Sequence, residues 1–342
     1  MMGHFPVPYP DELLYSVFAR YYAHSGYMAY AFAAQDLFVK KATKPDIEFI
    51  NELTPDALER ITQHIPLESV IEKHTMFPYY ARFLPKVRRQ QAFSFLFQMD
   101  ERYHNHLYLP KSKHIARFLR YCPLCAKEDR AQYGEAYWHR IHQMTGINIC
   151  PKHHCQLQNS PVPISSKDSP SLITVEECVL PLDNVIFSDN ELEINVAEYV
   201  CSVFNSPVDM DTDISVGQFF HSKMEYTKFL SSRGEQRNTA LIHSDFSAHY
   251  VSLPDHPLKE QWQIQKMLSS DRLSTYEVCL FAMFLGIPPA DLVKMTRPEI
   301  SQSQWFDEKI RTLHSQGLKY PEIARQMNAS YDVVKAIGEG RY

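Results

Sequence analysis

The chain has 342 residues, of which 44% are hydrophobic and 22% charged, so its composition is globular and excludes a largely disordered protein. Its length allows two or three domains. Its net charge of −5 gives no general attraction for nucleic acid, although local patches can provide one. Because no apolar stretch approaches the ~20 residues of a membrane span and no signal peptide is visible, we expect a cytoplasmic protein without a membrane partner.

The N-terminal third is predicted to be helical. Three prolines between residues 5 and 10 predict an extended start. A helix should follow, with Asp11 and Glu12 in its first turn, where the helix dipole favours negative charge, and with Gly26 at its end. Pro78 and Pro85 should break the chain further on. The spacing of apolar residues predicts more helices at 29–40, 55–63, 66–75 and 86–100.

Two pairs of metal-binding residues follow, Cys122-Pro-Leu-Cys125 and, 24 residues later, Cys150-Pro-Lys-His153. The two-residue gap within each pair lets both side chains turn onto one ion while backbone N–H groups point at the thiolates. Three sulfurs and one nitrogen complete a tetrahedral zinc site with no position left for water. The spacing therefore predicts one structural Zn²⁺ and no catalytic metal, and thiolate ligands exclude a magnesium or calcium site.

Two alternatives remain open at this site. His154 and Cys155 adjoin His153 and could take the fourth position, although only His153 preserves the two-residue spacing. The other alternative is two unrelated pairs of buried cysteines, which requires the same spacing to arise twice by chance.

The segment between the two pairs contains YGEAYWHR at 133–140. Its aromatic residues Tyr137 and Trp138 are expected to pack in the core over the zinc loop. The polar residues beside them, His139, Arg140 and His142, could instead reach DNA phosphate groups.

A basic stretch precedes the cysteines. Residues 82–120 contain nine Lys/Arg and two Asp/Glu, in contrast to the acidic chain as a whole. Such a stretch can supply phosphate contacts that give salt-dependent affinity without sequence information. The candidates are Lys111, Lys113, Arg117 and Arg120, and the alternative is a solvated helix face.

Beyond the cysteines, residues 159–170 are rich in Ser, Pro and Asp and predict a linker. Residues 171–190 could hold a short strand. Residues 233–256 are polar and His-rich and separate predicted helices. Those helices are expected at 191–204, 216–231, 257–268, 274–285 and 289–294.

Residues 303–342 predict a helix-turn-helix. Gly317 should end a first helix, Pro321 suits the first turn of a second helix, and Ser330 is a good N-cap for a third. This third helix would read DNA bases through Tyr331, Lys335 and their neighbours. The alternative is a plain three-helix packing unit without a DNA-binding role. The sequence ends close to this helix, so we expect the natural chain to continue.

Several of these segments together resemble the TniQ/TnsD family of transposon target-selection proteins, and more closely its TnsD branch. A weaker likeness covers residues 256–270 and the C-terminal helices. The segments that carry the resemblance are FPVPYPDELLYSVFAR (5–20), EKHTMFPYYARFLP (72–85), RYCPLC (120–125), YGEAYWHR (133–140) and CPKHH (150–154).

The resemblance implies a non-enzymatic protein that binds double-stranded DNA at a specific attachment site and recruits a AAA+ ATPase, which brings in transposase subunits. It also implies the family's Cys3His zinc site at the four residues identified above. The segment around 5–25 is the expected ATPase contact. The alternative is a TniQ-type adaptor that links a CRISPR RNA-guided effector complex to the same ATPase.

A zinc hydrolase or nuclease is disfavoured because the predicted metal site is closed. The expected fold class is mainly α, with a zinc module embedded after a multi-helix N-terminal domain. The predicted domains are a helical TniQ-like domain (1–118), a zinc module (119–158), a linker (159–190), a helical domain (191–300) and a helix-turn-helix (301–342).

Overall fold

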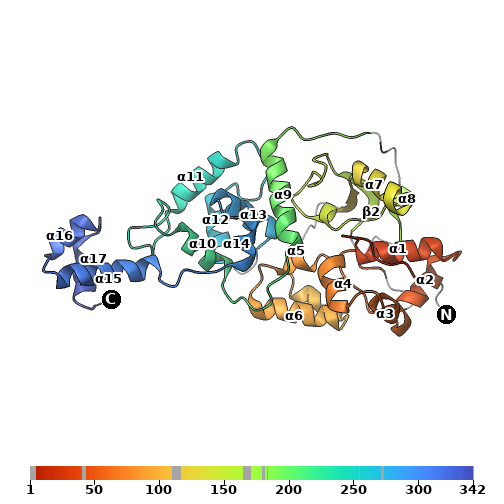
Figure 1. The fold of residues 1–342 in the computed structure, drawn as a ribbon, viewed down its shortest axis with the longest axis horizontal. Helices are drawn as coiled ribbons and strands as arrows, with labels where there is room; N and C mark the ends of the chain where they lie inside the picture. Colours follow the sequence, from red (N-terminus) through yellow and green to blue (C-terminus); the bar gives the residue numbers. More distant parts are fainter. Residues whose placement is uncertain are drawn as a thin grey trace. The chain divides into compact units, whose positions relative to one another are not determined.

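The computed structural model describes residues 5–40, 44–109, 117–164, 171–178, 182, 184–253, 255–270 and 273–341. These residues are mainly helical, as the sequence predicts, and include a small sheet of two strands (Figure 1). None of the described helices is long and apolar enough to cross a membrane. The chain forms two compact units, Met1–Asp213 with Arg272–Met283, and Ile214–Asp271 with Phe284–Tyr342.

The first unit contains the predicted zinc module and the helices before it. Strands β1 (Phe118–Tyr121) and β2 (Gln158–Pro163) pair antiparallel, and two short 3-10 helices lie at Glu101–Asn105 and Ile141–Gln143. The α-helices of this unit are α1 (Leu14–His24), α2 (Tyr30–Leu37), α3 (Pro55–Thr62), α4 (Leu67–His74), α5 (Phe77–Ala81), α6 (Lys86–Phe97), α7 (Pro123–Tyr133), α8 (Val175–Cys178), α9 (Glu191–Asn205) and most of α13 (Thr275–Phe284).

Helix α1 begins later than predicted. Asp11 has a φ of +58°, so it lies outside the helix, which starts at Leu14. Asp11 and Glu12 therefore do not lie in the first turn of α1, where they would interact with the helix dipole. The Asp11 carboxylate instead accepts a hydrogen bond from Arg140 Nε at 3.1 Å, and the Glu12 carboxylate pairs with Arg20 at 2.9 Å. Gly26 follows the end of α1 with a φ of +72°, as expected of a helix stop.

The segment 138–140 lies beside the start of α1 and binds it through the backbone. Leu13 N–H donates to the Trp138 carbonyl at 2.9 Å, and Arg140 N–H donates to the Asp11 carbonyl at 2.9 Å. The Trp138 N–H donates to Ser16 Oγ at 3.0 Å. Two of the segments that carry the family resemblance, 5–20 and 133–140, are therefore hydrogen-bonded to each other in the core.

The structure of this unit differs from the sequence analysis in four places. Residues expected to form a linker include strand β2, which tolerates Pro161 and Pro163 because β1 is its one described neighbour. The described part of 171–190 contains helix α8 and no strand among its named elements. The proline-rich break between α4 and α6 contains helix α5, with Pro78 in its first turn. Helix α7 was not predicted.

The named elements of the second unit are all helices, and one isolated β-bridge joins Leu230 to Arg237. The sequence predicted no helix within 233–256, yet α11 forms there, capped by the Asn238 side chain. It buries Ile242 and Phe246, a stripe too narrow to stand out among polar residues. The helices of this unit are α10 (Val216–Met224), α11 (Thr239–His249), α12 (Gln261–Ser269), α14 (Pro289–Lys294), α15 (Gln302–Ser315), α16 (Tyr320–Gln326) and α17 (Tyr331–Gly338).

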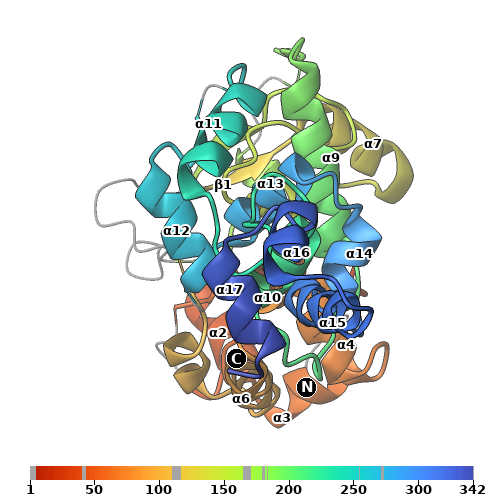
Figure 2. The same ribbon diagram turned by 90° about the vertical axis from the view of Figure 1, so that its left-hand side faces the viewer.

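The last three helices form where the sequence predicted them and lie side by side in both ribbon views (Figure 2). Gly317 has a φ of +93° after α15, and Ser330 Oγ accepts from Val333 N–H at the start of α17. Their shared apolar core consists of Phe306, Ile310, Leu313, Ile323, Ala324, Val334 and Ile337.

A tight turn at 231–234 holds this three-helix group within the second unit. Arg233 forms two hydrogen bonds with Asp307 of α15, at 2.9 and 3.0 Å. The Ser232 hydroxyl donates to the Asn328 carbonyl, between α16 and α17, at 2.9 Å. The Ser232 carbonyl accepts from Gln302 Nε2 at 3.0 Å. The turn therefore holds the start of α15 and the connection between α16 and α17.

Candidate metal centre

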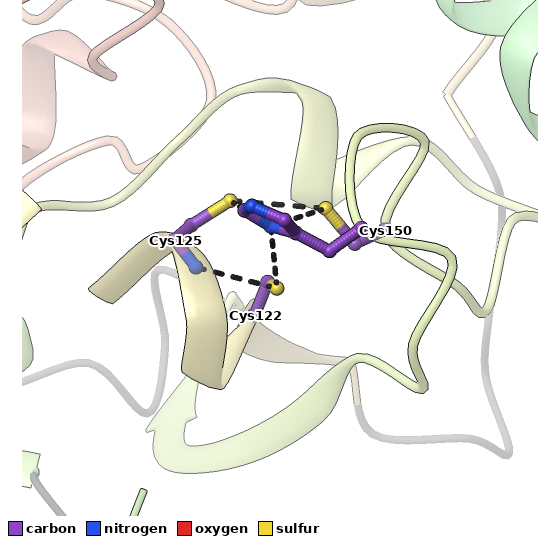
Figure 3. A group of neighbouring side chains, drawn as sticks. Cys122, Cys125 and Cys150 are labelled. Atoms are coloured by element: carbon purple, nitrogen blue, oxygen red, sulfur yellow. Dashed lines mark hydrogen bonds between the residues drawn. The ribbon is translucent and has the colours of Figure 1, made fainter. Parts of the chain in front are cut away.

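Three cysteine side chains and one histidine side chain converge in the first unit. The donor atoms of Cys122, Cys125, Cys150 and His153 all lie within 4.8 Å of one another. Figure 3 shows the three cysteines, which come from two separate segments of the chain, pointing toward one another. All three cysteines are buried, whereas the His153 side chain is 14% exposed.

The distances between these donors fit a tetrahedral zinc ion. Zn–S bonds of about 2.3 Å and Zn–N bonds of about 2.0 Å place two sulfurs about 3.8 Å apart, and a sulfur and a nitrogen about 3.5 Å apart. Cys125 Sγ lies 3.7 Å from Cys150 Sγ. His153 Nδ1 lies 3.3 Å from Cys125 Sγ, 3.4 Å from Cys122 Sγ and 3.8 Å from Cys150 Sγ. The four residues could therefore hold one zinc ion.

The first pair is positioned by the start of α7. Cys122 is the N-cap of this helix, and its sulfur accepts a hydrogen bond from Cys125 N–H at 3.5 Å. Pro123 occupies the first turn, where its fixed φ suits a helix and its missing N–H costs nothing. The N-terminus of a helix also favours a thiolate. Hydrogen bonds from neighbouring thiols, first that of Cys125, lower the pKa of Cys122.

The second pair lies in a closed loop. The Cys150 carbonyl accepts from His154 N–H, and Cys150 N–H donates to the Cys155 carbonyl, both at 2.8 Å. The left-handed φ of +56° at His154 lets the chain reverse there. These bonds turn the His153 ring back toward the sulfurs, whereas His154 contacts Glu198 at 2.8 Å and is not among the four donors.

Two further residues support the ligands, and the sequence reasoning missed both. Glu128 Oε1 lies 3.0 Å from His153 Nε2, so a carboxylate can orient the imidazole that offers Nδ1 to a metal. A hydrogen bond from Lys152 lowers the pKa of Glu128. The buried His142 ring lies 3.8 Å from Cys150 Sγ through Nε2. Once α7 is known, the three-residue spacing from Cys125 identifies Glu128, but no local pattern identifies His142.

The polar residues near Trp138 serve the protein interior. His139 lies 2.9 Å from Asp129 through Nε2 and 3.7 Å from Asp11 through Nδ1. Burial lowers the pKa of His139, but the two carboxylates outweigh it and raise that pKa to about 9. Trp138 is fully buried, and its indole N–H donates to the Ile173 carbonyl at 2.8 Å. Core packing of Trp138 is confirmed, although these contacts join it to α1 and residue 173.

The arginines predicted to bind phosphate have partners inside the protein. Arg117 pairs with Glu48 at 2.8 Å, and Arg120 donates to the carbonyls of Ile147 and Met144 at 2.6 and 2.7 Å. Arg140 is 5% exposed. These contacts account for the three guanidinium groups, so their proposed DNA contacts stay predictions that the structure does not favour. Lys111 and Lys113 lie outside the described residues.

The remaining predicted contacts, Tyr331 and Lys335, lie on one face of α17. The Tyr331 side chain is 45% exposed, and the Lys335 ammonium lies 5.9 Å from the centre of its ring. Glu339 Oε1 lies 4.0 Å from Lys335 Nζ. This pair belongs to the second unit and the metal centre to the first, so the predicted site residues form two separate groups.

The fold and the donor set define a mainly helical protein with a buried Cys3His group suited to one zinc ion. Residues 4–157, which include all four donors, match the TniQ family. It is also similar to "Transposon Tn7 transposition protein TnsD" of Escherichia coli, with 32% identity over 161 residues. That similarity covers 44% of this chain and 30% of the length of TnsD.

Proposed function

We propose that this chain is a DNA-binding target-site selector for a Tn7-like transposon. The observation that carries the proposal is the TniQ match over residues 4–157, which includes the interlocked start of α1 and the whole metal centre. The similarity to TnsD supports the same function. A bound zinc ion would join two segments 24 residues apart, and this chain's own part is to hold the four donors in place.

We assign direct DNA contact to the three helices α15–α17, arranged as a helix-turn-helix. Support comes from the caps, the shared core and the exposed face of α17 at Tyr331, Asp332 and Lys335. In this motif the N-terminal residues of the last helix contact base edges in the major groove. Residues 301–341 contain six Lys/Arg and five Asp/Glu, so this group supplies few phosphate contacts by itself. Lys111 and Lys113 are proposed as further phosphate contacts.

Recruitment of a AAA+ ATPase is the second part of the proposal, and it rests on the TniQ match over residues 4–157. The expected contact segment, 5–25, contains α1, whose residues Leu14–Tyr21 are all buried. An ATPase would therefore meet the exposed residues on either side of that run, such as Val7, which is 49% exposed. Co-purification with the ATPase encoded beside the transposase tests this part, and failure of the two proteins to associate contradicts it.

The first experiment measures binding of the full chain to a tiled library of host chromosomal DNA at ~150 mM salt, with and without a zinc chelator. We expect tight binding at one short site, and loss of that binding on chelation. Weak binding that is equal for all sequences and steep in salt would refute a direct selector. It would leave the CRISPR-linked adaptor as the function to test, with a guide-RNA complex as the partner.

A second experiment separates base reading from phosphate contact. Lys335→Ala should weaken binding and change the slope of log affinity against log salt by about one if Lys335 meets a phosphate. Tyr331→Ala should reduce discrimination between target and random DNA. Lys266→Ala, which removes an exposed cation from α12 of the same unit, is the matched control and should change neither quantity. Equal effects at Lys266 and Lys335 would contradict the assignment to α17.

A further inference from the structure

A fifth metal-binding side chain lies against the centre. Cys155 is fully buried, and its Sγ lies 3.3 Å from Cys122 Sγ. It is not one of the four donors that lie within 4.8 Å of one another. The 3.3 Å separation is shorter than the roughly 3.8 Å between two sulfurs bound to the same zinc. Cys155 therefore stands beside a ligand, at hydrogen-bond distance, rather than in the ligand set.

The backbone around Cys155 holds its side chain at this place. Its carbonyl accepts from Cys150 N–H at 2.8 Å, which joins it to the loop that carries His153. It also pairs with Phe187 in an isolated antiparallel bridge, and the next residue, Gln156, donates to the Ile186 carbonyl at 2.8 Å. Rotation about the Cα–Cβ bond can move the sulfur while the backbone stays in place.

The four donors are not equally protected. His153 is the one whose side chain reaches the surface, and the carboxylate that orients it, Glu128, is 49% exposed. The three cysteines are buried, and Leu124, Leu157 and Val185 pack against their cluster. If the imidazole is lost, three thiolates remain in surroundings that favour a sulfur over water as the fourth ligand of zinc.

We propose that Cys155 is a reserve ligand of this centre, which completes a four-thiolate site when His153 is absent. In the native centre its thiol donates to the Cys122 sulfur. In the replaced centre it gives up its proton to solvent and binds the metal as a thiolate. A fourth thiolate adds a buried negative charge, so the replaced centre binds zinc more weakly than the native one. The inference is independent of the proposed function.

The test compares the full-length wild type with His153→Ala, Cys155→Ala and the double variant. Zinc per chain is measured by mass spectrometry, and Co²⁺ substitution reports the number of thiolates through its charge-transfer absorbance. We expect one metal ion per chain in both single variants and a loss of metal in the double variant. The absorbance of His153→Ala should rise by about a third, because four Co–S bonds replace three. Cys155→Ala should retain the three-thiolate spectrum.

Three results would overturn the proposal: His153→Ala without metal, His153→Ala with a three-thiolate spectrum, or Cys155→Ala without metal. A milder variant guards against failure to fold. Glu128→Gln loosens His153 but keeps every ligand. In that background, Cys155→Ala should release zinc to a chelator several times faster. Equal release rates with and without Cys155 would also refute a reserve role.

Discussion

Replacing Arg140 with methionine should destabilise the first unit rather than weaken DNA binding. The Arg140 Nε donates to Asp11 at 3.1 Å, and its NH1 donates to the carbonyls of Glu72 and Thr75. Its guanidinium also lies 4.8 Å from the centre of the Phe204 ring. Methionine fills much of the same volume, but it supplies no donor to any of these three oxygens.

The loss of folding free energy depends on how well the Asp11 carboxylate is solvated and bonded once Arg140 is removed. Removing one partner of a buried ion pair costs roughly 3–5 kcal/mol. The Asp11 side chain is 21% exposed, and it keeps a hydrogen bond from Ile141 N–H at 3.1 Å and the contact with His139 at 3.7 Å. We therefore expect the lower end, about 3 kcal/mol, which corresponds to a fall of roughly 1–1.5 M in the urea midpoint.

Tryptophan fluorescence can follow the first unit alone. Trp138 lies in that unit and is fully buried, whereas Trp262 and Trp305 lie in the second unit and are 58% and 43% exposed. Replacing the two exposed tryptophans with phenylalanine leaves Trp138 as the single reporter. Urea titrations in this background should rank wild type above Arg140→Lys, and Arg140→Lys above Arg140→Met.

A different result would restore Arg140 to the DNA interface. If Arg140→Met keeps the wild-type urea midpoint but changes the salt slope of DNA affinity by about one, then Arg140 contacts a phosphate group. In that case the contacts with Asp11 and the two carbonyls do not contribute measurably to stability. The structure instead predicts that Arg140→Met lowers the urea midpoint, and that the protein which remains folded binds DNA with the wild-type salt slope.

Two further predictions concern the stability of the first unit. Burial lowers the pKa of His74 to about 4, so the unfolded chain takes up a proton near pH 6.5 while the folded protein does not. The contribution of His74 to the free energy of unfolding should fall by roughly 3 kcal/mol as the pH drops from about 6.5 to 4. The difference between the urea midpoints of wild type and His74→Gln, followed over this pH range, should report that contribution. Gly146→Ala should destabilise the protein more than Gly134→Ala. Both glycines have φ near +86°, so the backbone strain of an alanine is similar at the two positions. A Cβ at Gly146 would meet Tyr276 at 2.4 Å, whereas a Cβ at Gly134 would meet no described atom within 4 Å. Equal thermal shifts in the two variants would contradict this.

Local patterns in the sequence were sufficient for features that depend on local geometry. The spacing of Cys122 and Cys125 predicts a knuckle because a two-residue gap places both sulfurs on one point wherever the segment lies. The helices α15, α16 and α17 were predicted because Gly317 and Ser330 act on the backbone next to them. The predicted resemblance to the TniQ family was confirmed over residues 4–157, since its motifs are continuous stretches of chain.

The tertiary structure alone decided what the charged and polar side chains contact. A run of nine Lys/Arg resembles a DNA-binding surface, but whether a guanidinium meets solvent or a carbonyl depends on segments far away in the chain, as at Arg120 and Ile147. In the sequence, Asp11 and Glu12 fit the first turn of a helix. In the structure, residues 138–140 bind Asp11 and Arg20 binds Glu12, and both residues lie before the helix. Cys155 is adjacent to His153 in sequence, yet its contact with Cys122 comes from a loop closed by long-range pairing. Neighbouring residues in the sequence determine the local backbone geometry. The contacts of buried charges and thiols are determined only when distant segments pack together.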